Sequence, residues 1–254
     1  QRTGKTPTVL YALHLKALTR IAVVCPASAI YQWRDEYERW TGHTAIAVSG
    51  TPAQRKALFT QAAQLWQNDT PCGLIINYDL LRMQKQDFDL FKAMNTQAIV
   101  LDEAHRMRNP KTATAKAMFK LTDIPVRYCL TGTPTMNHTH EVWSILHFLY
   151  PHTFNSYWSF INEYFYTTRQ TNPRGQTYMD IGKINFKGIL MFNSMLPRMS
   201  VVRKRKDVMQ WLPDKEYVPI KLEPTSKQRK YLDELADIWE TEDIVTIGTL
   251  DRLI

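Results

Sequence analysis

The run Ile99-Val100-Leu101-Asp102-Glu103-Ala104-His105 (IVLDEAH) is a short apolar segment, typical of a buried strand, that ends on two adjacent carboxylates. Two stretches with apolar residues at helical spacing, Thr6–Leu18 and Lys111–Leu121, lie elsewhere in the chain. Between such stretches come four more short apolar runs: Ile21–Cys25, Ala45–Val48, Leu74–Asn77 and Tyr128–Thr131. Strands that alternate with helices in this way are typical of an α/β fold with a mostly parallel sheet between helices. Ligands of such sheets bind beyond the carboxyl ends of the strands, so we expect functional residues directly after these runs.

Composition and cysteine spacing are those of an intracellular globular protein. The 254 residues are 44% hydrophobic and 22% charged, which is ordinary for a soluble domain. No apolar run approaches the roughly 20 residues that span a bilayer, and no secretory pattern opens the chain. Cys25, Cys72 and Cys129 are odd in number and lack CxxC spacing, which argues against a disulfide framework or a zinc site. We therefore expect reduced core thiols and no membrane association.

The positive charge is concentrated towards the C-terminus. Residues 183–230 contain 12 Lys or Arg and 4 Asp or Glu, so this stretch holds the whole formal net charge of +8. A polyanionic partner explains this concentration, and a solvated basic face explains it about as well.

Three motifs carry the chemistry. Gly4-Lys5-Thr6 precedes a helix, where backbone N–H groups cradle phosphate, lysine reaches the β- and γ-phosphates, and threonine ligates Mg²⁺. At the end of the IVLD strand, Asp102 is suited to hold Mg²⁺ through water, and Glu103 is suited to orient and deprotonate an attacking water. Leu130-Thr131-Gly132-Thr133-Pro134 follows another strand, and its hydroxyls and glycine turn are suited to sensing phosphate. The order and spacing of the three motifs indicate a site for ATP with Mg²⁺.

In this order the motifs resemble those of the SNF-type ATPases of helicase superfamily two. Residues 25–33 (CPASAIYQW) are similar to motif Ia of that family, and residues 75–81 (IINYDLL) are similar to motif Ib. Residues 102–117 (DEAHRMRNPKTATAKA) match the run that extends motif II. Residues 130–151 (LTGTPTMNHTHEVWSILHFLYP) match motif III and its helix. Residues 203–208 (RKRKDV) and 212–215 (LPDK) resemble the segment that leads towards a second motor lobe.

The resemblance implies an ATP-dependent motor that tracks along double-stranded DNA inside the cell, usually without separating the strands. It also implies two RecA-like lobes with ATP and Mg²⁺ between them. This chain matches the first, RecA-like P-loop lobe, so the second lobe of the same protein is expected to complete the site, and this chain alone is expected to be inactive.

The resemblance also assigns roles to individual residues. The implied catalytic residues are Lys5, Asp102, Glu103 and His105. The implied ATP-binding residues are Gly4, Lys5, Thr6, Asp102 and Glu103, with Thr6 and Asp102 at the metal. Coupling is expected from Thr131, Gly132 and Thr133. Contact with DNA is expected from Ser28, Gln32, Asn77, Arg203, Lys204, Arg205 and Lys206.

Composition and resemblance together predict three parts. Residues 1–152 form the RecA-like lobe, whose beginning is expected to lie before residue 1. Residues 153–198 are rich in aromatic residues, Met and Asn, and form a small helical insertion with a loop signal at Thr171–Gly175. Residues 199–254 form a basic connection towards the second lobe, with a charged helix from about Ser226. The aromatic residues of the insertion are suited to base stacking or to a small core, and their spacing favours the core: Tyr157, Trp158, Phe160, Tyr164 and Phe165.

Two departures from the family pattern leave alternatives open. Arg2 stands where the family usually has a glycine, and Pro7 lacks a backbone N–H that phosphate could meet. These departures permit a catalytically silent nucleic-acid-binding module, whereas the intact Lys5, Asp102 and Glu103 argue against it. The other alternative is a DEAH-type helicase lobe that unwinds RNA or DNA. The TGTP form of motif III and the basic C-terminal segment favour the duplex-DNA translocase over that alternative.

Overall fold

The computed structural model describes residues 3–133, 138–172, 175–203 and 223–241, with side chains described as far as residue 233 in the last range. The chain divides into two compact units, Gln1–Met209 and Gln210–Ile254. None of the helices in the described ranges is long and apolar enough to cross a membrane.

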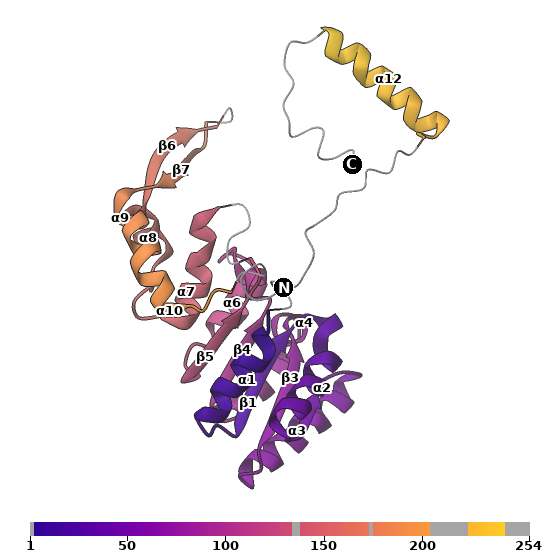
Figure 1. The fold of residues 1–254 in the computed structure, drawn as a ribbon, viewed down its shortest axis with the longest axis vertical. Helices are drawn as coiled ribbons and strands as arrows, with labels where there is room; N and C mark the ends of the chain where they lie inside the picture. Colours follow the sequence, from indigo (N-terminus) through magenta and orange to yellow (C-terminus); the bar gives the residue numbers. More distant parts are fainter. Residues whose placement is uncertain (1–2, 134–137, 173–174, 204–222, 242–254) are drawn as a thin grey trace. The chain divides into compact units, whose positions relative to one another are not determined.

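A five-stranded parallel sheet forms the centre of the first unit, in the order β2-β3-β1-β4-β5 (Figure 1). Its strands agree with the five predicted runs to within two residues at each end: β1 (Arg20–Cys25), β2 (Ala45–Ala47), β3 (Cys72–Asn77), β4 (Ala98–Asp102) and β5 (Val126–Leu130). Because all pairs are parallel, the carboxyl ends of the strands lie at one edge of the sheet. The predicted α/β fold with a mostly parallel sheet is therefore confirmed.

Helices connect the strands and cover the sheet. They are α1 (Lys5–Leu15), α2 (Ile30–Thr41), α3 (Pro52–Gln67), α4 (Tyr78–Met83), α5 (Lys85–Ala93), α6 (Ala113–Phe119) and α7 (Trp143–Leu149). Short 3-10 turns precede some of them: η1 (Ala27–Ala29), η2 (Ala104–Met107) and η3 (Thr139–Val142). The helix predicted at Thr6–Leu18 ends at Leu15, because Ala17 adopts a left-handed backbone with φ 52° that no α-helix continues.

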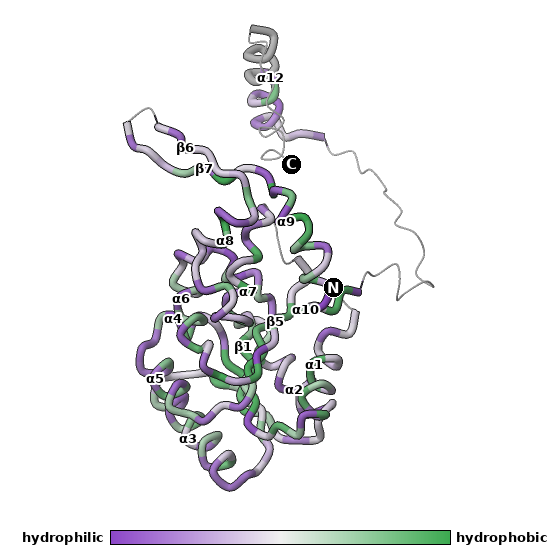
Figure 2. Tube along the Cα trace, turned by 90° about the vertical axis from the view of Figure 1, so that its left-hand side faces the viewer, coloured by the Kyte–Doolittle hydropathy of each residue, from purple (hydrophilic) through white to green (hydrophobic). Residues whose placement is uncertain are grey.

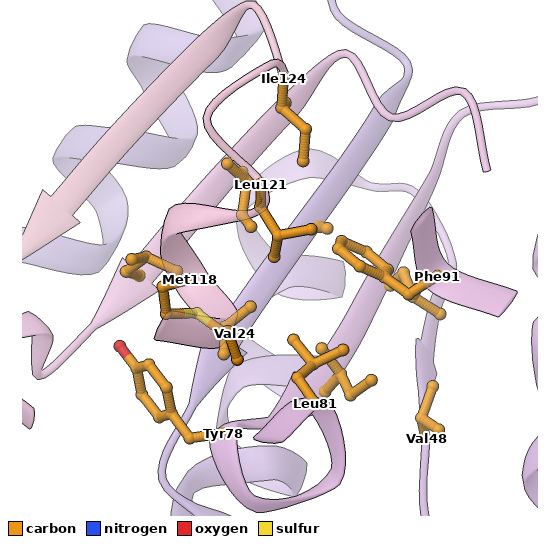
Figure 3. Close-up of a cluster of buried hydrophobic side chains, with 14 of the residues drawn as sticks. Val24, Val48, Tyr78, Leu81, Phe91, Met118, Leu121 and Ile124 are labelled. Atoms are coloured by element: carbon orange, nitrogen blue, oxygen red, sulfur yellow. The ribbon is translucent and has the colours of Figure 1, made fainter. Parts of the chain in front are cut away.

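Strands β1 to β4 are buried along most of their length, which explains their mostly apolar sequences, whereas every residue of β5 is only partly buried. In β1, Ile21, Val23 and Cys25 pack with α1 and α2, whereas Ala22 and Val24 pack with α3 to α7 on the other face. Figure 3 shows Val24 in this second cluster, with side chains from α4, α5 and α6 around it. In Figure 2, β1 is coloured as hydrophobic, whereas α3 and α5 carry both hydrophilic and hydrophobic residues.

After α7 the chain forms a smaller set of elements: α8 (Tyr157–Tyr164), β6 (Phe165–Thr171), β7 (Thr177–Ile184), α9 (Phe186–Leu190), the π-helical turn η4 (Met191–Met195) and α10 (Leu196–Met199). The helices agree with the predicted helical insertion, but the antiparallel β6–β7 hairpin does not (Figure 1). Of the predicted loop signal at Thr171–Gly175, Thr171 ends β6, and the described residues Asn172 and Gly175 lie between the two strands. The predicted boundaries at residues 152 and 198 stay predictions.

The aromatic residues of this part form a small core of their own. Phe160 and Phe165 are 3% and 4% exposed and pack with Trp143 of α7, whereas Trp158 is 45% exposed. The packing supports the core interpretation for Phe160 and Phe165. In the second unit, α12 (Ser226–Thr241) confirms the charged helix predicted from about Ser226.

Candidate functional site

Asp102, Thr131 and Asn77, three of the predicted site residues, lie at the carboxyl edge of the sheet. Asp102 is the last residue of β4 and is paired in register with Leu130 of β5, directly before Thr131. On the other side of β4, Cys25 at the end of β1 is paired with Asn77 at the end of β3. Motifs far apart in the sequence therefore come together because neighbouring parallel strands end at the same level.

The Gly4-Lys5-Thr6 segment forms the start of α1. Gly4 is the N-cap and has φ 78° and ψ 28°, a left-handed conformation that glycine adopts without steric cost. Pro7 lies in the first turn, where helical N–H groups have no intrahelical partner, so the helix tolerates it. The first turn closes through Thr8, whose N–H and hydroxyl both donate to the Gly4 carbonyl, at 3.1 Å and 2.8 Å. The N–H groups at such a helix start are suited to binding phosphate.

A chain of polar contacts joins the three motifs. The Lys5 Nζ lies 3.8 Å from Glu103 Oε1, and the His105 Nδ1 lies 3.2 Å from Glu103 Oε2. The same His105 nitrogen is 3.2 Å from the Thr131 hydroxyl, and the Thr133 N–H donates to that hydroxyl at 3.1 Å. Lys5, the Glu103–His105 segment and the Thr131–Thr133 segment are thus joined by polar contacts.

Asp102 is held from two sides. The Trp33 indole N–H donates to Asp102 Oδ2 at 2.8 Å, and the Tyr78 hydroxyl donates to the Asp102 backbone carbonyl at 2.7 Å. Burial is the main cause that raises the pKa of Asp102, and the hydrogen bond from Trp33 acts in the opposite direction. Asp102 is thus an oriented carboxylate at the sheet edge rather than a freely rotating one.

Glu103 has an unusual backbone. Its φ and ψ are both 49°, the left-handed region that few non-glycine residues occupy. The conformation ends β4 abruptly and starts the η2 turn that carries His105. Strained backbone of this kind persists only where surrounding contacts hold it, and it is frequent at active sites.

The donor set at this edge fits ATP with Mg²⁺. Mg²⁺ prefers oxygen ligands and usually keeps several waters, with one or two carboxylates from the protein. The Thr6 hydroxyl and the Asp102 carboxylate are donors of this kind. The described ranges, this edge included, contain no group of three His, Cys, Asp or Glu side chains arranged to ligate a metal.

The residues expected to contact DNA lie at the adjoining part of the edge. Ser28 in η1 and Gln32 in α2 are exposed, and Asn77 at the start of α4 is partly buried. The Asn77 side-chain oxygen accepts the Leu80 N–H at 2.8 Å, so Asn77 is also the N-cap of α4.

The basic segment Arg203–Lys206 is only partly described. The Arg203 guanidinium donates to the Thr8 hydroxyl at 3.2 Å, so the first residue of this segment contacts the helix that carries Lys5. Lys204, Arg205 and Lys206 lie outside the described residues, and so does Arg2.

Trp33 and Tyr78 were not predicted as site residues. Both stand inside the stretches that resemble motifs Ia and Ib, but no local pattern indicates their partner. Their bonds to Asp102 span 69 and 24 residues, and only the strand order brings them together.

Comparisons with known proteins test the family resemblance. A family model described as "SNF2-related domain" matches residues 3–252. "Probable ATP-dependent DNA helicase CHR12" of Arabidopsis thaliana is 29% identical over 223 residues, which cover 85% of this chain and 19% of that protein. "Chromatin-remodeling ATPase INO80" of Cryptococcus neoformans is 27% identical over 212 residues, which cover 82% of this chain and 12% of that protein. "Chromatin structure-remodeling complex subunit snf21" of Schizosaccharomyces pombe is 30% identical over 234 residues, 89% of this chain and 19% of that protein.

The chain spans between 12% and 19% of the length of these three relatives. A solved structure titled "Sulfolobus solfataricus SWI2/SNF2 ATPase core in complex with dsDNA" superposes on 63% of this chain and 32% of its own, with 27% identity and a TM-score of 0.49. The family assignment rests on the family model, whose match covers nearly the whole chain. The chain therefore belongs to the SNF2-related domain family, which confirms the resemblance predicted from its motifs.

Proposed function

We propose that the chain is the ATP-binding lobe of an ATPase that is stimulated by duplex DNA and moves along it. The observation that carries the proposal is the chain of contacts from Lys5 through Glu103 and His105 to Thr131. These contacts group a cation, a carboxylate, an imidazole and a hydroxyl at the sheet edge where α/β proteins bind ligands. The names of the relatives, an ATP-dependent DNA helicase and a chromatin-remodeling ATPase, support the same reaction.

Each side chain has a role in this proposal. The Lys5 ammonium binds the β- and γ-phosphate oxygens of ATP, next to the N–H groups at the start of α1. Thr6 and Asp102 would hold Mg²⁺, which would neutralise phosphate charge. Glu103 orients the attacking water and accepts its proton, and His105 connects Glu103 to the Thr131–Thr133 loop. ATP hydrolysis by this chain alone is expected to be negligible, because two-lobed motors complete the site with residues of the second lobe.

We propose that duplex DNA binds at the sheet edge beside the ATP site, because this edge offers neutral polar groups. A hydroxyl and an amide from Ser28 and Gln32 can meet phosphates and sugars, and such contacts carry no sequence information. A motor that steps over any sequence requires contacts of this kind. The excess positive charge of residues 183–230 supports a polyanionic partner.

ATP hydrolysis by the full-length protein tests the proposal, with duplex DNA, single-stranded DNA, RNA or no nucleic acid added. We expect duplex DNA to give the largest stimulation. A protein stimulated best by RNA would instead be a DEAH-type unwinding helicase, and one that binds nucleic acid without turnover would be a silent binding module. The Glu103→Gln variant, purified in parallel, excludes a contaminating ATPase.

A further inference from the structure

Two hydrogen bonds reach Asp102 from opposite faces of the sheet. Trp33 belongs to the hydrophobic cluster between the sheet and helices α1 and α2, and Tyr78 belongs to the cluster on the other face. In Figure 3, Tyr78 lies with Val24 and Met118 in this second cluster. The donors use different acceptors: Trp33 binds the side-chain Oδ2, and Tyr78 binds the backbone carbonyl.

The pleat of β4 explains why each donor meets its acceptor. Ala98 and Val100 face the α1–α2 cluster, and Ile99 and Leu101 face the other. Side chains alternate along a strand, so Asp102 continues the series of Ala98 and Val100 and points towards α2. The carboxylate is thereby presented to Trp33, which leaves the backbone carbonyl for Tyr78.

Both donors are fixed in place. Trp33 is 4% exposed and Tyr78 is 1% exposed, so neither ring can move without its helix. Packed interiors transmit such displacements because they contain little free space. A shift of α2 or α4 must therefore move a donor that touches Asp102.

The same two segments carry the residues expected to touch DNA. Gln32 directly precedes Trp33 on α2, and Asn77 directly precedes Tyr78 at the start of α4. Each residue expected to contact DNA is thus joined by one peptide bond to a residue that is hydrogen-bonded to Asp102. Tyr78 has a second effect, because the carbonyl that it binds belongs to the peptide group joining Asp102 to the strained Glu103.

We propose that Trp33 and Tyr78 are positioning residues that hold Asp102 and Glu103 in place and transmit DNA binding to the ATP site. This inference rests on the proposed function. DNA held at Gln32 and Asn77 fixes α2 and α4, these helices fix the two donors, and the donors fix the carboxylates that serve hydrolysis.

The test uses Trp33→Phe and Tyr78→Phe in the full-length protein, because each variant keeps a buried ring and removes the donor group. We expect kcat with saturating duplex DNA to fall about five- to tenfold in each, the factor that the loss of one hydrogen bond represents. The rate without DNA should fall less, so the stimulation ratio should decrease. The KM for ATP and the Kd for DNA should stay within about twofold.

The chain offers a matched control for each variant. Tyr37→Phe removes a hydroxyl that is equally buried but has no hydrogen-bond partner among the described residues. Trp66→Phe removes an indole N–H of a residue that is also 4% exposed, but this group donates to the Cys72 carbonyl, at the start of β3 and away from the site. Both controls should keep the wild-type stimulation ratio.

The outcomes separate the inference from the proposed function. A wild-type protein that duplex DNA does not stimulate would contradict the proposed function itself, and the inferred transmission with it. A stimulated wild type with unchanged ratios in both Trp33→Phe and Tyr78→Phe would overturn the inference alone. Equal losses of stimulated and unstimulated rates, matched by a lower melting temperature, would also overturn it, since they would indicate a purely structural role. If Trp33→Phe fails to fold, Tyr78→Phe decides the question.

Discussion

Lys5 and Glu103 lie 3.8 Å apart, yet we expect their removal to affect different steps. Lys5→Ala deletes charge that matches the phosphates in the ground state and the transition state alike, so ATP binding should weaken. Glu103→Gln keeps the shape and removes the base, so kcat should fall by several powers of ten while nucleotide affinity is retained. Nucleotide titration and steady-state turnover of the full-length protein measure the two effects. Hydrolysis near the wild-type rate in Glu103→Gln would assign the base to another residue.

The three cysteines are predicted to be unreactive in the folded chain. Burial raises the pKa of Cys25 to about 12 and that of Cys72 to about 11, and it also raises the pKa of Cys129. At about pH 8 the thiolate, which is the reactive form, is therefore scarce at each position. Maleimide labelling followed by mass spectrometry should be slow in buffer and rapid in denaturant. Fast labelling of Cys25 in buffer would contradict the packing at the end of β1.

Among the elements, the strands of the central sheet could be predicted and the β6–β7 hairpin could not. Strands β1 to β4 are largely buried, so each one reads as a mostly apolar run. Strand β5 is only partly buried, and the run predicted for it began two residues late, at Tyr128. The hairpin strands are exposed along most of their length, and without a buried face they have no alternating apolar pattern to detect. Helix ends were predicted less well than helices, as Ala17 shows, because a left-handed alanine has no sequence signature.

Helices α3 and α5 are joined by a buried ion pair whose loss should be costly. Arg55 Nε and Asp87 Oδ2 are 2.8 Å apart, and the two residues are 8% and 2% exposed. Asp87→Ala leaves the guanidinium buried with only its bond to the Gly50 carbonyl, so the free energy of unfolding should fall by about 3 kcal/mol. Urea denaturation measures this change.

The neighbouring pair Lys85–Asp89 supplies the control for this prediction. Its side chains are 88% and 57% exposed, and an exposed pair contributes little. Asp89→Ala should therefore change the free energy of unfolding by less than about 0.5 kcal/mol. Similar small losses in Asp87→Ala and Asp89→Ala would show that Arg55 reaches solvent when its partner is removed.

At the scale of the whole molecule, motif order predicted which residues meet but not how they are held. Lys5, Asp102, Glu103 and Thr131 could be grouped because each follows a strand or opens a helix at the same edge. The bonds from Trp33 and Tyr78 depend on strand order, on the pleat of β4 and on two packed helices at once. Sequence spacing contains none of these three-dimensional relations, which is why both residues were recognised only as parts of a motif.

The residues of the basic segment Arg203–Lys206 should serve two functions, stability of the lobe and binding of DNA. Arg203 donates to Thr8 in α1, so Arg203→Gln is expected to lower the melting temperature slightly with little effect on DNA binding. Replacing Lys204, Arg205 and Lys206 together with Gln should make the log–log salt dependence of duplex binding shallower, by about 0.9 for each DNA phosphate that is no longer neutralised. Binding titrations at several salt concentrations and thermal unfolding of the full-length protein measure both quantities.

Arg203→Gln and the triple variant serve as controls for each other. An unchanged salt slope in the triple variant, together with a lower melting temperature, would mean that the whole segment braces the lobe. A shallower slope in Arg203→Gln would mean that Arg203 leaves Thr8 to bind DNA.

The left-handed backbone of Glu103 means that a substitution can raise thermal stability while it abolishes catalysis. A residue with a Cβ atom in this conformation costs about 1 kcal/mol, whereas glycine adopts it freely. Glu103→Gly would thus relax the end of β4 while it removes the base. The inactive variant should therefore have a melting temperature no lower than that of the wild type. Laboratory evolution of this lobe for heat resistance alone would consequently favour loss of the catalytic carboxylate, so selection must include turnover at every round.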